Sequence, residues 1–305
     1  MDGGESGVAA NRSFRVAAVL AVGVLSFAFA PILVRWADDA PGLAIAVWRT
    51  VIAAGAVVPL AALRSREEIR QFDGRDVLLI GAAGVFLGLH FIAWIESLYH
   101  TTVASASVLV TTSPIFLAVL GYVVIGDRLS GRTVAAILLA VSGAALIGWG
   151  DAGRVLLGRG ALFGNGLALG AAVLVSVYLL IGRVVRQQVS WLAYVAPLYA
   201  AAAATAVAAA WWQGVPLFSY SWTFYALCAG LALGPQLVGH GSFNYAVQHV
   251  PAAIVGMLAL FEPVGASILA YLLFGEVPPV TAITGMIIVM TGVAIVVWER
   301  RSGGD

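Results

Sequence analysis

The chain has 305 residues, of which 61% are hydrophobic and 10% are charged, and its formal net charge is +1. A soluble domain carries roughly a quarter charged residues, so this composition excludes an ordinary water-soluble fold. The chain has no lysine and one cysteine, Cys228, which excludes a Walker A loop, a retinal Schiff base and an intramolecular disulfide. Because no Cys/His cluster has ligand spacing, we expect neither a metal nor a cofactor.

Ten runs of mostly apolar residues follow one another along the chain. They lie at about 14–36, 41–63, 76–98, 102–125, 131–150, 160–182, 190–213, 220–247, 250–274 and 279–298. A helix that crosses the hydrocarbon core needs about 20 apolar residues, because lipid offers no partner to the backbone. Most tryptophans fall near the ends of these runs, where amphipathic rings prefer the lipid interface. The sequence therefore predicts an all-α membrane protein with ten transmembrane helices.

The arginines orient this arrangement. Of the sixteen, twelve fall on one side of a ten-span protein and three, Arg35, Arg154 and Arg159, on the other, while Arg49 lies inside a span. Basic residues concentrate on the cytoplasmic side of membrane proteins. We therefore expect a multi-pass protein of the plasma (inner) membrane with both termini in the cytoplasm.

The two halves of the chain are related by an internal repeat. A shift of 149 residues aligns 103–149 with 252–298 without a gap and gives nine identities, among them Pro114 with Pro263. Such self-similarity indicates a duplicated architecture. Each copy holds five spans, an odd number, so the second copy enters the membrane from the opposite side and the copies are inverted repeats. We predict a tail at 1–13, a first repeat at 14–150, a linker at 151–159, a second repeat at 160–299 and a tail at 300–305.

Several short motifs of this repeat are similar to those of a known family. They are Ser97-Leu98-Tyr99-His100-Thr101-Thr102, Ser113-Pro114, Gly126-Asp127-Arg128-Leu129, Val250-Pro251-Ala252-Ala253, Glu262-Pro263 and Gly275-Glu276, with Trp48-Arg49 in the second span. The pattern resembles the EamA-type repeat of the drug/metabolite transporter superfamily over nearly the whole chain, although Asp127 stands where that repeat usually has glutamate. The resemblance implies a ten-helix permease and, for the direction of transport, export.

Ionisable groups inside a span point to a functional site, because an Asp or Arg at a helix centre costs about 2.5–3.5 kcal/mol on insertion scales. Glu262 lies in mid-span before Pro263, whose ring removes a backbone hydrogen bond. We expect its carboxylate to bind a substrate amine or to accept the coupled proton; the alternative is a structural acid. Its repeat partner Ser113, with Thr111 and Thr112, places hydroxyls beside the other kink, where bonding to their own helix is the alternative.

The eighth span carries a polar stripe, in which Gln236, His240, Asn244 and Gln248 follow one another at four-residue steps. Such a stripe drifts slowly around an α-helix and faces protein or water, not lipid. We expect it to line a cavity, with His240 as a proton carrier. The alternative is a set of hydrogen bonds between helices. Gly234-Pro235 predicts a bend just before the stripe.

Two further spans contribute candidates. His90 and Trp94 share one face of the third span and offer an imidazole and an aromatic wall to a substrate. A packed structural pair is the alternative. Arg49 lies inside the second span, and we favour an ion pair from Arg49 to an acid, such as Glu96, over contact with a carboxylate-bearing substrate.

Inverted repeats are typical of secondary transporters, whose substrate site lies near the midplane between the halves. We therefore predict a secondary-active transporter, not an enzyme, that exports a small polar or zwitterionic metabolite, such as an amino acid, by alternating access. A membrane-embedded hydrolase or a channel is the alternative, but the chain has no H-E-x-x-H, no G-x-S-x-G and no filter signature. The expected partners are a small-molecule substrate and the lipid bilayer, not nucleic acid; proton coupling and a homodimer stay open.

Overall fold

The computed structural model describes residues 3–37, 39–101, 103–152, 159–275, 277 and 280–302. Within these ranges every regular element is a helix. Several residues used in the sequence analysis lie outside the described residues, namely Thr102, Arg154, residues 153–158 of the predicted linker, Glu276 and the extreme ends of both predicted tails.

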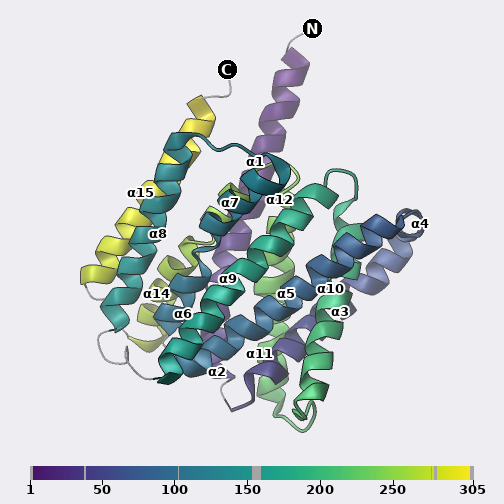
Figure 1. Ribbon diagram of the computed structural model, residues 1–305, viewed down its shortest axis with the longest axis vertical. Helices are drawn as coiled ribbons and strands as arrows, with labels where there is room; N and C mark the ends of the chain where they lie inside the picture. The colour runs from purple at the N-terminus through teal and green to yellow at the C-terminus, as the bar shows by residue number, and fades with distance from the viewer. Residues whose placement is uncertain are drawn as a thin grey trace.

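The helices divide evenly between the two halves of the chain (Figure 1). The first half forms α1 (Gly3–Phe27), α2 (Ala30–Trp36), α3 (Gly42–Arg64), α4 (Arg66–Arg70), α5 (Gly74–His100), α6 (Val103–Val110), α7 (Ser113–Ile125) and α8 (Gly131–Ala152). The second half forms α9 (Arg159–Val185), α10 (Trp191–Trp212), α11 (Trp222–Leu231), η1 (Ala232–His240), α12 (Gly241–Ala246), α13 (Ala252–Leu258), α14 (Phe261–Phe274) and α15 (Val280–Ser302). The element η1 is a π-helix, with hydrogen bonds that span five residues.

These helices occupy the ten predicted spans. Among the described residues, 8 stretches are long and apolar enough to cross a membrane, from Phe14–Trp36 to Val280–Glu299. The span predicted at 131–150 is α8, whose apolar part is Gly131–Leu146, and the span predicted at 220–247 is divided into α11, η1 and α12. The chain is therefore an all-α membrane protein with ten transmembrane segments, as predicted. The domain boundaries stay predictions; α1 begins at Gly3, inside the expected tail, and α8 ends at Ala152, inside the expected linker.

Helices that hold equivalent places in the two repeats pack against each other. The last helices, α8 and α15, lie side by side, and so do the second, α3 and α10 (Figure 1). Gly143 packs on Val289 while Gly292 packs on Ala140, so α8 and α15 are antiparallel. The turns after α7 and α14 also match, because Gly126 and Gly275 both adopt a positive φ, 71° and 69°. The halves are thus inverted repeats, and α1 begins at the end of the molecule where α15 ends (Figure 1).

Four of the ten transmembrane segments are interrupted near their middle. Breaks separate α1 from α2, α6 from α7 and α13 from α14, and the π-helix interrupts the eighth segment. Proline lies in the first turn of α2 and of α7, and Pro235 lies inside η1. Proline has no N–H and clashes with the preceding turn, which explains why regular hydrogen bonding stops at these places. Backbone groups freed in this way need protein or water around them, since lipid cannot bind them.

The close contact between α8 and α15 gives a stability test. A Cβ atom at Gly143 would lie 2.7 Å from the Gly285 carbonyl oxygen and 2.8 Å from the Val289 nitrogen. We expect Gly143→Val to destabilise the protein by about 1–3 kcal/mol, the usual cost of overpacking, and to lower the thermal unfolding midpoint in detergent. Gly166→Val is the matched control, because nothing lies within 4 Å of its Cβ position. Equal midpoints for the two variants would contradict this packing.

Candidate functional site

The interruptions of the transmembrane segments meet at one cavity between the two repeats. The cavity and its open mouth together hold about 570 Å³ of space not filled by protein atoms, of which about 50 Å³ admits the centre of a water molecule. Its wall includes Phe27 and Ala30 at the first break, Val110, Thr111 and Ser113 at the second, Ala259 and Glu262 at the third, and Pro235 and His240 of the π-helix. Arg49, His90, Phe91 and Trp94 complete much of the remaining wall from α3 and α5. The cavity is therefore built from both halves.

Arg49 is buried in the cavity wall, with 1% of its surface exposed. Its Nε donates a hydrogen bond of 3.2 Å to Gln236 Oε1, and its guanidinium carbon lies 3.9 Å from the centre of the Phe91 ring. A ring face attracts a cation through its negative quadrupole. The predicted ion pair with an acid is wrong for the described residues, because no carboxylate among them lies within 4 Å of Arg49. Glu96 instead contacts His100, at 3.3 Å.

Glu262 brings a carboxyl group to the same cavity. Only 8% of its surface is exposed, and its Oε1 has no hydrogen-bond partner among the described residues. Leaving a buried polar atom without a partner is costly, so such an atom calls for a ligand, a water or a proton. The structure thus places a carboxyl group with unused hydrogen-bonding capacity in the same wall as the Arg49 cation.

Two histidines of the cavity wall lie next to each other. The rings of His90 and His240 lie 5.8 Å apart, and Phe27 and Phe91 each stand edge-on to His240 at 5.0 Å. His90 Nδ1 lies 2.9 Å from the Ala171 carbonyl oxygen, which only accepts, so we assign the proton of His90 to Nδ1. The Tyr178 hydroxyl lies 3.2 Å from His240 Nδ1. Each imidazole is therefore oriented by one polar contact.

The remaining hydroxyl and indole candidates divide into two groups. Trp94 and Ser113 line the cavity, and Trp94 Nε1 has no hydrogen-bond partner among the described residues. Thr112 is not among the residues of the wall, and its hydroxyl donates to the Leu109 carbonyl at 2.6 Å. Thr111 lines the cavity instead, although its hydroxyl bonds to its own helix through the Ser107 carbonyl at 2.7 Å. Of the two predicted threonines, Thr111 lies in the wall, and both hydroxyls bond to carbonyls of their own helix, which was the alternative.

The polar stripe of the eighth segment does not face one surface. His240 reaches the cavity, Gln236 is fully buried against Arg49, and Asn244 is fully buried away from the cavity wall. Gln248 Oε1 accepts a hydrogen bond of 2.9 Å from Arg186, whose pKa is lowered by burial. The prediction assumed α-helical steps, whereas η1 has a wider turn and changes the direction of successive side chains.

Sequence reasoning missed an aromatic part of the wall. Phe27, Phe91 and Phe243 line the cavity and surround the His240 ring or lie next to it. Phe91 had a usable signal, because it lies three residues before Trp94 and thus on the same face of the helix. No sequence signal marks Phe27 as a wall residue, since its position depends on how α1 packs against the second repeat.

Comparison with known proteins identifies similar chains. The model of the EamA-like transporter family matches residues 15–149 and 162–298. The "Probable terminal-alkyne amino-acid exporter" of Streptantibioticus cattleyicolor is 27% identical over 302 residues, which cover 93% of each chain. The "Uncharacterized transporter YetK" of Bacillus subtilis is 26% identical over 74% of this chain and 68% of that one. A solved crystal structure, 17% identical, superimposes on 95% of this chain and 99% of its own with a TM-score of 0.79, which shows the fold alone.

The contact between Arg49 and Gln236 gives a second stability test. In Gln236→Leu the buried Arg49 Nε loses its acceptor, and an unsatisfied buried polar group costs about 1–3 kcal/mol. We expect a lower unfolding midpoint in detergent for this variant. Gln213→Leu, at an exposed position after α10, is the control and should unfold like the parent protein. If Gln236→Leu unfolded at the parent temperature, the hydrogen bond would have no energetic role.

Proposed function

The chain belongs to the EamA-like transporter family and is a membrane transporter, and from this premise we propose that it is a secondary-active exporter of a small zwitterionic metabolite, an amino acid or a related compound. The substrate occupies the cavity between the repeats and reaches each side of the membrane by alternating access. The observation that carries this proposal is the presence of one cation, Arg49, and one acid, Glu262, in the same largely apolar cavity.

The two charged groups suit the two ends of a zwitterion. Among the described residues Arg49 uses only its Nε in a hydrogen bond, so its two terminal nitrogens stay available for a substrate carboxylate. Guanidinium and carboxylate form strong, charge-assisted hydrogen bonds. The unpartnered Oε1 of Glu262 accepts from the substrate amine in the same way. Each end of the substrate thereby supplies a partner that the residues of the wall do not give to these atoms.

The rest of the wall favours a substrate with an apolar or weakly polar side chain. Phe27, Phe91, Trp94 and Phe243 contribute rings, and Val110, Val175 and Leu179 contribute aliphatic surface. The name of the Streptantibioticus relative, an amino-acid exporter, supports both the substrate class and the direction. We place the protein in the plasma (inner) membrane with both termini in the cytoplasm, because basic residues concentrate on that side. The proposal assigns no catalytic reaction to the chain.

We propose proton coupling at Glu262. A carboxyl group that binds either a substrate amine or a proton, but not both, exchanges one for the other across the membrane. His240, which lines the same cavity beside Tyr178, is the second candidate carrier, because its ring nitrogens can bind and release a proton.

Counterflow in proteoliposomes tests these residues. Purified protein should exchange a radiolabelled amino acid from a mixed panel saturably, and Glu262→Gln should lower the rate about tenfold or more, since losing a charge-assisted contact costs at least about 1.4 kcal/mol. His240→Ala should also lower it strongly. Glu67→Gln, at a side chain 79% exposed on α4, is the control. Wild-type exchange in both cavity variants would remove these assignments, and release of a chemical product would favour an enzyme.

Substrate analogues test the two-ended binding. The amide of a transported amino acid lacks the carboxylate, and the N-acetyl derivative lacks the amine. Each should inhibit counterflow by the parent amino acid about tenfold more weakly than the unlabelled amino acid does, because each loses one charge-assisted contact. In Glu262→Gln the penalty for N-acetylation should shrink while the penalty for the amide stays. An unchanged N-acetyl penalty in that variant would show that Glu262 does not bind the amine.

A further inference from the structure

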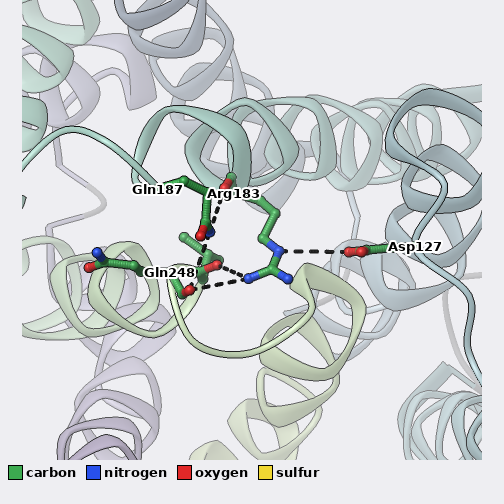
Figure 2. A network of polar contacts seen from close by, with 5 residues as sticks. Asp127, Arg183, Gln187 and Gln248 are labelled. Atoms are coloured by element: carbon green, nitrogen blue, oxygen red, sulfur yellow. Dashed lines mark hydrogen bonds and ion pairs between the residues drawn. The ribbon is translucent and has the colours of Figure 1, made fainter.

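Polar side chains join the two repeats at the end of the molecule that carries most arginines. Arg183, near the end of α9, lies with its Nε 3.7 Å from Asp127 Oδ2, in the turn after α7 (Figure 2). The side chains are 21% and 28% exposed. Asp127 belongs to the first repeat and Arg183 to the second, so this ion pair spans the boundary between the halves. The left-handed Gly126 turns the chain just before Asp127.

The same guanidinium also holds a third segment. Arg183 Nη1 donates to the Val247 carbonyl at 2.9 Å and to the Gln248 carbonyl at 3.3 Å, where the chain leaves α12 (Figure 2). Gln187 Nε2 donates to the Gln248 carbonyl as well, at 3.2 Å. These carbonyls follow the last turn of a helix and have no partner within it. Arg183 is therefore fixed in position on the second repeat, and its approach to Asp127 depends on how close the repeats are.

The fourth segment (α6 and α7) and the ninth segment (α13 and α14) lie close together at the arginine-rich end and farther apart at the opposite end. The half-helices α7 and α13 pack tightly, so that a Cβ atom on Gly256 would lie 2.5 Å from Leu117 Cδ1. The half-helices α6 and α14, which hold the matching places toward the opposite end, contact each other much less. An inverted repeat in which one end is packed and the other is loose corresponds to one of two alternating arrangements. In this structure the two repeats are packed more closely at the arginine-rich end than at the other.

We propose that Arg183 and Asp127 form the gate of this end, an ion pair that closes the cavity toward the cytoplasm and separates whenever the repeats move to open it. This proposal depends on the proposed function in one respect, namely that the cavity carries a substrate. A partly exposed ion pair adds little to overall stability, so it suits a contact that opens and closes in each cycle. The tight hold of Arg183 on the 247–248 carbonyls keeps the cation in place while Asp127 leaves.

Cysteine accessibility tests the gate without any substrate. Replacing the single cysteine by Cys228→Ser gives a cysteine-free background, and Ala259→Cys then places one thiol in the cavity wall. A charged, membrane-impermeant methanethiosulfonate reagent is applied to inside-out vesicles, which expose the arginine-rich end. We expect Asp127→Asn and Arg183→Gln each to raise the labelling rate severalfold. The pair Arg70 and Glu67 is the matched control, since it lies at 3.2 Å within α4 and spans no boundary, so Glu67→Gln should leave labelling unchanged.

A charge-conserving variant separates gating from misfolding. Asp127→Glu keeps an acid opposite Arg183 and should label near the slow parental rate, whereas Asp127→Asn should label fast, because only Asp127→Glu retains the ion pair. Misfolding would not separate the two variants in this way, since asparagine has nearly the shape of aspartate. Slow labelling of both single neutral variants, or equal acceleration by Glu67→Gln, would overturn the gate. Accelerated labelling in a protein that transports none of the amino acids tested would keep the gate and remove the proposed substrate.

Discussion

In the hydrocarbon core of a membrane, every backbone N–H and C=O must find its partner inside the protein, and the rest of this structure depends on that constraint. Six of the ten segments meet it as uninterrupted helices. The other four break or widen in mid-membrane, at α1–α2, α6–α7, η1 and α13–α14. Such breaks are tolerated only where other protein groups or a cavity surround them, so their positions also mark where the cavity lies.

The breaks converge because the repeats are inverted. A segment of one copy and its equivalent in the other cross the membrane in opposite directions, so breaks near mid-span fall at similar depth from both sides. Ser113 and Glu262 hold equivalent places beside Pro114 and Pro263, and both line the cavity. The duplication is thus chemically unequal: one copy supplies a hydroxyl and the cation Arg49, while the other supplies the acid and His240. This inequality puts one cation and one acid in the wall of the same cavity.

The packing between the two repeats is also unequal along the length of the molecule. At one end α7 and α13 are packed and Arg183 joins Asp127, while α6 and α14 diverge toward the other end. Two copies of one repeat need not adopt the same conformation at the same time. In the proposed transport cycle the packed and loose ends exchange places, and the strength of the contacts at each end decides which arrangement is populated.

The sequence by itself determined the membrane class, the ten spans, the inverted duplication and the mid-span position of Glu262, because the bilayer imposes length, hydropathy and charge rules that are local along the chain. Only the tertiary structure decided which polar groups meet. Arg49 bonds to Gln236 and not to Glu96, Thr111 lies in the wall, and Asn244 is fully buried while His240 lines the cavity. These outcomes depend on the rotation of each helix about its axis and on the π-helix, which set the direction of a side chain but leave no mark on hydropathy.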